Sequence, residues 1–189
     1  MVNKLKQGFT IVEVLVVIAV LAILMGIVTT AASSSIKQAR ERRASAMRVT
    51  LQAGLATYYA RENKWPNVIE QYANNMPSDK TTAEIEGAAA DNTFRQLVRE
   101  SMKNKGEPYI DPSSLFVANA SRVPSNPYSS NGKLREVYGA DFREAIKKNG
   151  KRYISIDNMA FGYPDKSTGY FRRYKIKYNS QTDSVTVSQ

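Results

Sequence analysis

The chain has 189 residues, with 27 Lys and Arg against 17 Asp and Glu, and therefore a formal net charge of +10. It contains neither Cys nor His, which excludes disulfide bonds, the thiol- and imidazole-based nucleophile systems and the usual zinc sites. No phosphate-binding glycine loop or acid–base pair stands out, so we expect no enzyme activity, no cofactor and no metal site.

The first eight residues, MVNKLKQG, form a short basic segment with charges at Lys4 and Lys6. A conventional signal peptide has small residues and its cleavage site after the apolar region, whereas here Gly8 lies in front of that region. Cleavage between Gly8 and Phe9 would remove residues 1–8 as a leader and keep the apolar segment as an anchor.

Residues 9–32 are apolar enough for a transmembrane helix, which needs about 20 residues, and no polar side chain occurs from Val14 to Val28. Glu13 is the exception. A carboxylate at the centre of a membrane helix costs roughly 2.5–3.5 kcal/mol, less near an end, and the neighbouring apolar side chains offset this. No local feature accounts for Glu13, which makes it a candidate functional residue.

The segment from the basic leader and Gly8 through Phe9-Thr10 and Glu13 to the uninterrupted span resembles the type IV pilin and type II secretion pseudopilin superfamily. The resemblance implies that a prepilin peptidase cuts between Gly8 and Phe9 and methylates the Phe9 amine. It also implies that Glu13 meets the Phe9 amine of a neighbouring subunit during filament assembly. The chain lacks the Pro that many members carry in the second half of the span. The alternative is an ordinary signal anchor with an incidental Glu.

Residues 33–63 continue the span as an amphipathic helix. Because no breaker lies between Phe9 and Asn63, one helix of about 55 residues is predicted. Its apolar stripe should pack on a C-terminal head, residues 64–189, and consists of Ala44, Met47, Leu51, Leu55 and Tyr58. The basic residues after the span suit lipid head groups or acidic residues of adjacent subunits; they are Lys37, Arg40, Arg42, Arg43 and Arg48.

Pro66 ends the long helix, and the only Trp, Trp65, precedes it. A Tyr, a short polar turn and an aromatic–Pro pair at this spacing resemble the helix end of major pseudopilins. Any helix that ends against a core can use the same residues, so this second resemblance is less specific.

The head is predicted to combine short helices with a C-terminal antiparallel sheet, which makes the fold α+β. Helices are expected from a cap at Asp91-Asn92 and within residues 134–146, and short strands at 115–117 and 153–156. Alternation in residues 170–178, a turn at 179–183 and a return strand predict a hairpin over 170–188.

In that hairpin, Tyr174, Ile176 and Tyr178 should face the helix stripe, and Arg173, Lys175 and Lys177 should be exposed. The loop aspartates Asp157, Asp165 and Asp183 do not spell a calcium loop and are expected to be solvated turn residues.

These patterns predict a structural subunit of a pilus-like filament, most simply a type II secretion pseudopilin that drives protein export. The expected partners are copies of itself, sibling pilin-like subunits, prepilin peptidase, an inner-membrane assembly platform and membrane lipids. The resemblance implies a single-pass protein of the bacterial cytoplasmic membrane with its head in the periplasm or outside, although charge counting alone would place the head in the cytoplasm.

The alternative is a type IV pilin or minor pilin for adhesion, motility or DNA uptake. The basic strand residues could contact DNA phosphates, but no aromatic stacking platform accompanies them, so nucleic acid is not expected as a partner. A membrane-anchored enzyme is the third class, and no site supports it.

Overall fold

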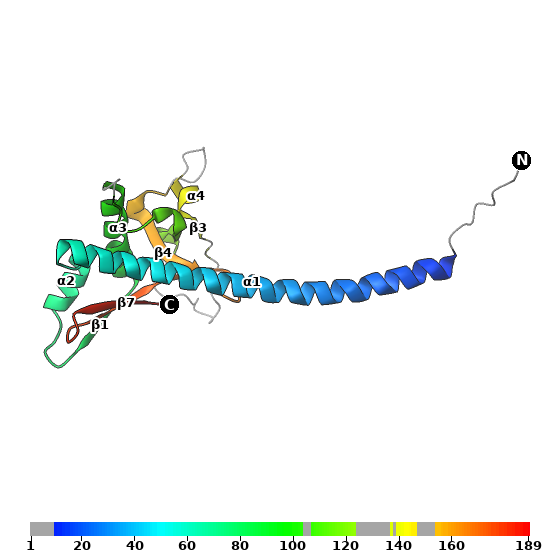
Figure 1. Cartoon of the computed structure of the whole chain (residues 1–189), viewed down its shortest axis with the longest axis horizontal. Coiled ribbons are helices and arrows are strands. Elements are labelled where there is room, and N and C mark those ends of the chain that lie inside the picture. Colours follow the sequence, from blue (N-terminus) through cyan, green and yellow to red (C-terminus); the bar gives the residue numbers. More distant parts are fainter. Residues whose placement is uncertain (1–9, 104–106, 124–136, 138, 147–153) are drawn as a thin grey trace, which may run out of the picture. The chain divides into compact units, whose positions relative to one another are not determined.

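The computed structural model describes residues 10–103, 107–123, 137, 139–146 and 154–189. The chain divides into two compact units, residues 1–39 and residues 40–189. Apart from Thr10, the described part of the first unit lies in helix α1 (Ile11–Glu62), and the second unit contains the rest of α1 and the other described elements (Figure 1). The predicted α+β class, with one long amino-terminal helix, small helices and antiparallel sheets, is confirmed.

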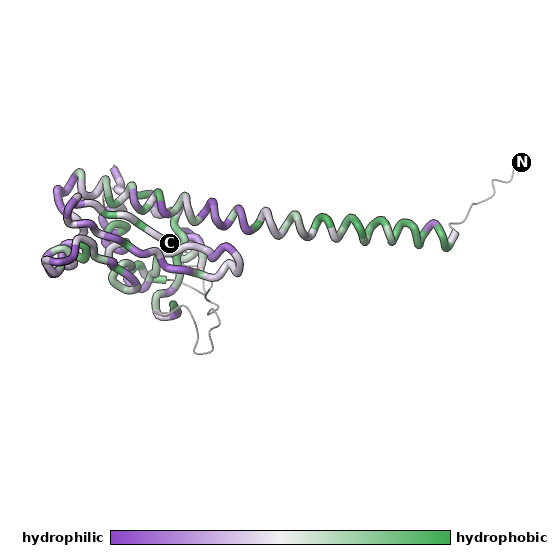
Figure 2. Tube along the Cα trace, turned by 90° about the horizontal axis from the view of Figure 1, so that it is seen from below, coloured by the Kyte–Doolittle hydropathy of each residue, from purple (hydrophilic) through white to green (hydrophobic). Residues whose placement is uncertain are grey.

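Helix α1 is continuous over 52 residues. At 1.5 Å per residue it is about 78 Å long, close to the predicted length. Its side chains change character along the axis: the tube in Figure 2 is hydrophobic after the N-terminus and becomes mixed and largely hydrophilic further on. The two halves of the helix are therefore suited to different surroundings, the first to an apolar one and the second to a partly aqueous one.

In the second unit, α1 contributes one buried face to the core. The predicted stripe is confirmed, since each of its members is at most 4% exposed: Ala44, Met47, Leu51, Leu55 and Tyr58. Gly54 lies on the same face, and a Cβ there would lie only 3.1 Å from Leu97 Cδ2. The glycine therefore allows α1 to approach helix α3 (Gly87–Lys103) closely.

Two helices follow α1 in the head. Helix α2 (Asn67–Asn74) begins directly after Pro66, whose carbonyl accepts from the Ile69 and Glu70 N–H groups. Helix α3 begins at Gly87, which has φ +60°, so the predicted start at Asp91 is wrong. Asp91 is instead a buried residue within α3, and its carboxylate accepts hydrogen bonds from residues of a neighbouring sheet.

The first sheet has three antiparallel strands in the order β1 (Thr82–Ile85), β6 (Lys175–Asn179), β7 (Ser184–Ser188). The β6–β7 pairing, from Lys175↔Ser188 to Asn179↔Ser184, confirms the return hairpin. Tyr174, Ile176 and Tyr178 are buried as predicted. Strand β1 was not predicted, because the polar, Ala-rich sequence around it shows no alternation.

The second sheet has four antiparallel strands in the order β3 (Ala140–Asp141), β2 (Phe116–Asn119), β4 (Met159–Pro164), β5 (Phe171–Arg173). The predicted single strand over 170–178 is wrong, since the chain leaves this sheet at Tyr174 and enters the other. Tyr174 is 1% exposed, and its hydroxyl donates to the Ala44 carbonyl at 2.7 Å. Burying this ring against α1 redirects the strand.

Short elements complete the head. Helix α4 (Phe142–Ile146) is shorter than the helix predicted within 134–146, of which residues 134–136 and 138 lie outside the described residues. The strand predicted at 153–156 is wrong for its described part, because Ile156–Asn158 forms the 3-10 turn η3 and the strand starts at Met159. Two further 3-10 turns are η1 (Pro112–Ser114) and η2 (Ala120–Arg122).

Candidate functional site

The start of α1 is held by a reciprocal pair of side chains. The Glu13 Oε2 atom accepts from the Thr10 N–H at 2.8 Å and from the Thr10 hydroxyl at 3.0 Å. In return, the Glu13 N–H donates to Thr10 Oγ1 at 3.3 Å. This is a capping box, in which the N-cap residue and the residue three positions later satisfy each other's free N–H groups.

The capping box corrects the expectation that nothing local accounts for Glu13. Thr10 is the residue that sequence reasoning missed, although the pattern Thr-x-x-Glu before an apolar run is the sequence signature of such a box. A carboxylate at a helix N-terminus also interacts favourably with the helix dipole. Glu13 therefore has a structural role within the single chain, and any role between subunits comes in addition.

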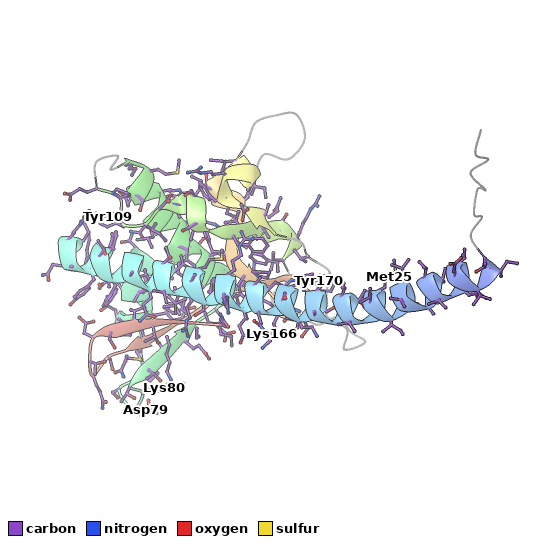
Figure 3. All side chains as sticks on the ribbon, turned by 45° about the vertical axis from the view of Figure 1, so that its right-hand side comes forward. Met25, Asp79, Lys80, Tyr109, Lys166 and Tyr170 are labelled. Carbon is purple, nitrogen blue, oxygen red and sulfur yellow. The ribbon has the colours of Figure 1, made fainter. Side chains whose placement is uncertain are left out.

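The apolar segment behind Glu13 is exposed along its whole length. Its large side chains from Val14 to Val28 are between 47% and 67% exposed, whereas core residues of the head are at most 9% exposed. They point outward around the helix, as the sticks near Met25 show (Figure 3). Of the described helices, α1 has the length and composition to cross a membrane. This is consistent with membrane anchoring.

Hydroxyl groups further along α1 are satisfied by the helix itself. Thr29 Oγ1 donates to the carbonyls of Met25 and Gly26, each at 3.0 Å, and Ser35 Oγ donates to the Ala31 carbonyl at 3.0 Å. Such bonds remove the cost of placing a hydroxyl in an apolar environment.

The expected processing residues Lys4, Lys6, Gly8 and Phe9 lie outside the described residues. Their roles in cleavage and methylation stay predictions. Thr10 is the first residue that the structure describes, and it would be the second residue of the chain after the expected cleavage.

Part of the basic cluster after the span serves the head rather than a lipid or a neighbour. Arg43 pairs with Asp141, and its guanidinium lies 5.0 Å from the centre of the Phe116 ring. Arg40 Nη1 donates to the Ser167 carbonyl at 3.4 Å. The nearby Glu41 pairs with Lys166 at 2.7 Å, and Lys166 lies beside α1 (Figure 3).

The helix end at Trp65 is built around one carboxylate of the terminal hairpin. Asp183 accepts from Tyr59 Oη at 2.5 Å, Trp65 Nε1 at 2.9 Å and Tyr178 Oη at 3.1 Å. The Tyr59 and Trp65 rings stack with centroids 4.3 Å apart. These hydrogen bonds, that from Tyr59 first, lower the pKa of Asp183. Asp183 was expected to be a solvated turn residue, but it accepts hydrogen bonds from three side chains, an arrangement that we call the Asp183 clasp.

The predicted basic face of the last strands is largely neutralised. Arg173 is not exposed: its Nε lies 2.9 Å from Asp91 Oδ2, and Asp91 also accepts from the Phe161 N–H at 3.0 Å. Lys175 pairs with Glu86. Burial raises the pKa of Asp91, while Arg173 beside it acts in the opposite direction. Asp91 could have been suspected from sequence, because it shares a helical face with Phe94 and Val98.

Within the residues that the structure describes, no group of three or more acidic side chains could hold a metal ion. Asp165 is engaged locally, since its Oδ1 accepts from the Ser167 and Thr168 N–H groups, and Asp157 pairs with Arg99.

A helix long and apolar enough to cross a membrane, with a Thr10–Glu13 capping box at its start and an α+β head later in the chain, is consistent with a membrane-anchored protein. Comparison with known proteins agrees at the same segment: residues 3–29 match the family described as the prokaryotic N-terminal methylation motif. The match supports a type IV pilin-like protein and implies filament assembly with other pilin subunits after cleavage by a prepilin peptidase. Searches of curated proteins and of solved structures found no match.

Proposed function

We propose that the chain is a type II secretion pseudopilin, a filament subunit that polymerises through α1 to drive protein export. The observation that carries this proposal is the motif match over residues 3–29, together with the position of Glu13, the one acid within the span, in the first turn of α1. Growth of the filament needs energy from a separate ATPase. An inner-membrane platform would couple that ATPase to the growing filament.

Processing comes first in this proposal. Prepilin peptidase cuts between Gly8 and Phe9, removes the charges of Lys4 and Lys6, and methylates the new Phe9 amine. That amine is a cation at a helix N-terminus, where the dipole already contributes about half a positive charge. Leaving it alone in a low dielectric is unfavourable, so it needs an anionic partner.

Glu13 is suited to be that partner in a neighbouring subunit. The capping box occupies its Oε2 atom, and no bond to Oε1 is found among the described residues. The box therefore holds the carboxylate in a fixed place while one oxygen can still accept from an incoming ammonium. A pair between subunits would set the axial register of one helix against the next.

Before assembly the exposed side chains of residues 14–28 would lie in the bacterial cytoplasmic membrane, with the leader inside and the head in the periplasm or outside. In the filament they would pack against copies of the same helix and against sibling subunits, which replace lipid as their surroundings. The chain thus exchanges one apolar environment for another, at little cost in hydrophobic energy.

The secretion role, rather than a type IV pilin role, is supported by the helix end at Trp65-Pro66, which resembles that of major pseudopilins. The alternative of DNA uptake is weakened by the ion pairs of Arg173 with Asp91 and of Lys175 with Glu86, because paired cations contribute little to phosphate binding.

Two measurements test the proposal. Mass analysis of the protein isolated from its native cells should find a mature chain that begins with N-methylated Phe9; a functional protein that still begins at Met1 would contradict it. Deletion of the gene should then reduce the proteins released into the medium and leave surface pili unchanged. Loss of pili with normal release would favour the pilin alternative.

A further inference from the structure

The two outer edges of the three-stranded sheet β1-β6-β7 differ in whether a side chain covers their outward-facing backbone groups. The Ser180 N–H donates to the Thr81 carbonyl at 2.9 Å, so in the β1–β6 register the backbone groups of Ala83 and Ile85 face β6. The N–H and C=O groups of Thr82 and Glu84 therefore face away from the sheet. By the same alternation, Val185 and Val187 face outward on β7.

The β7 edge is closed by a side chain of α1. Gln52 Nε2 lies 3.5 Å from the Val185 carbonyl, and the Val187 N–H donates to Gln52 Oε1 at 3.3 Å. The carboxamide of Gln52 thus takes the place of a strand residue and bonds two of the outward backbone groups, the Val185 carbonyl and the Val187 N–H. An unprotected sheet edge is a template for pairing with another chain. Gln52 covers the β7 edge and so hinders such pairing there.

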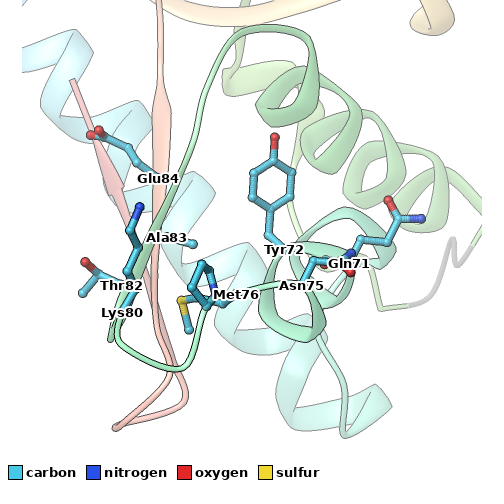
Figure 4. A pocket seen from close by; sticks show the side chains of 9 residues that line it. Gln71, Tyr72, Asn75, Met76, Lys80, Thr82, Ala83 and Glu84 are labelled. Atoms are coloured by element: carbon cyan, nitrogen blue, oxygen red, sulfur yellow. The ribbon is translucent and has the colours of Figure 1, made fainter.

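The β1 edge has no such cover among the described residues, and a groove of about 470 Å³ runs beside it. Figure 4 shows Tyr72, Asn75 and Gln71 of α2 on one side, Lys80, Thr82 and Glu84 on the other, and Met76 between them. Tyr72 is 40% exposed, although large aromatic side chains usually bury most of their area. The outward backbone groups of β1 thus lie beside a groove whose lining includes the apolar side chains of Tyr72 and Met76.

We propose that the β1–α2 groove, lined by Tyr72, Met76, Lys80, Thr82, Ala83 and Glu84, binds an extended peptide segment of another protein as an added antiparallel strand. This goes beyond the proposed function, because it concerns what the head recognises and not how the helix assembles. Main-chain hydrogen bonds to Thr82 and Glu84 would supply affinity, and the groove would select side chains.

The chemistry of the peptide follows from the register. Cross-strand neighbours share a face of the sheet, so the residue opposite Ala83 would enter the groove between Tyr72 and Met76 and should be apolar. The residue opposite Glu84 should be basic. Glu84 already lies across from Lys177 and 3.9 Å from Lys175, so a cation on its other side would extend an alternating row of charges.

The size of the groove favours a single segment over a second copy of the head. A groove of about 470 Å³ accommodates a few residues of extended chain. Helix α2 lies on the side from which a second sheet would have to approach and would obstruct it. The other edge of this sheet is also unable to join β1 of a neighbour, because Gln52 covers it.

The test uses the full chain in detergent micelles and the labelled peptide acetyl-Thr-Lys-Leu-Thr-Val-Glu-amide, with binding followed by fluorescence anisotropy. Binding is expected to weaken about tenfold in Tyr72→Ala and in Thr82→Pro, which removes an outward N–H without breaking the β1–β6 ladder. Met102→Ala, which truncates an exposed apolar residue on α3, is the matched control and should bind normally.

A peptide methylated on the Lys amide nitrogen gives the same test on the unchanged protein, and it should bind about tenfold more weakly than its parent. Absence of binding, or binding that is insensitive to both Tyr72→Ala and the methylated amide, would overturn the proposal. Self-association of the protein that Tyr72→Ala abolishes would overturn it in favour of a second copy. None of these readouts depends on processing or filament growth, so a failure here leaves the proposed function untouched.

Discussion

Trp65 Nε1 donates to Asp183 Oδ1 at 2.9 Å and so joins the corner after α1 to the turn of the terminal hairpin, 118 positions away in sequence. The carboxylate lies in a turn where Asp183 has φ +41°, a conformation that Asp and Asn tolerate better than most residues. Tyr59 and Tyr178 donate to the same group. One acid thus ties the last turn of the long helix to the end of the chain.

Replacing Asp183 with Asn should destabilise the head by about 1 kcal/mol, a modest amount because the carboxylate is exposed and screened by water. Asn suits the positive φ, but its NH₂ group would face one of the three donors. Unfolding of the full chain in detergent can be followed by the fluorescence of Trp65, the only Trp. Asp79→Asn, an exposed acid on a loop, is the control and should unfold like the unmodified protein.

The hydrogen bonds to Asp183 also predict how the difference in stability between the unmodified protein and Asp183→Asn depends on pH. Its donors hold the pKa of Asp183 below the usual value of 3.8, so the stabilisation is present above that pH and is lost as the pH falls through the lower folded-state pKa. The stability gap between the unmodified protein and Asp183→Asn should therefore shrink as the pH falls below 3.8. A gap that stays constant from neutral to acid pH would show that charge plays no part in the clasp.

The buried pair of Asp91 and Arg173 should be costly to break from one side. Asp91→Ala removes the carboxylate that accepts from Arg173 Nε and from the Phe161 N–H, and is expected to cost about 3–5 kcal/mol in the free energy of unfolding. The double variant Asp91→Leu/Arg173→Leu should recover much of that loss, because it removes both charges.

The exposed ion pair of Asp157 and Arg99 provides the comparison for that experiment. Asp157→Ala should change the stability by less than about 1 kcal/mol, as is usual for surface pairs. Equal effects of Asp91→Ala and Asp157→Ala would contradict the structural importance of the buried pair.

Two conservative variants separate the capping and pairing roles of Glu13. Glu13→Gln keeps the capping box, since Gln serves at this position, but removes the charge that would meet the Phe9 amine. Thr10→Ala removes the box and leaves the charge. We expect both proteins to reach the membrane fraction, and Glu13→Gln to be lost from filaments recovered from cells, while Thr10→Ala assembles at a reduced level.

The opposite outcome would change the interpretation of that acid. Normal assembly of Glu13→Gln together with failure of Thr10→Ala would show that Glu13 acts through the helix cap alone. Parallel measurement of helix content in detergent identifies any variant whose effect is a frayed first turn.

Gln52 should protect the protein against edge-to-edge association. Gln52→Ala uncovers the outward groups of Val185 and Val187, so we expect a loss of about 1 kcal/mol in stability and more oligomer as the concentration rises. Light scattering of the detergent-solubilised protein measures the second effect. Gln181→Ala in the exposed hairpin turn is the control; the interpretation fails should that variant associate equally.

The head shows why its details were harder to predict than its helix. Tyr174 continues the alternation of residues 170–178, yet its ring packs under α1 and the chain changes sheets at that residue. Gly162 permits the β4–β5 pairing, because a Cβ there would collide with the Arg172 carbonyl. Neither event leaves a periodic signal, since both depend on residues that are far apart in the chain.

The sequence by itself determined the long helix, its apolar first half, its buried stripe and its terminal acid, because helical periodicity and hydropathy are local properties. The tertiary structure alone decided that Asp183 clasps the helix end, that Asp91 neutralises Arg173, and that Gln52 closes one sheet edge while β1 stays open. Each of these is a contact between distant segments, formed only when burial brings polar groups together and obliges them to find partners.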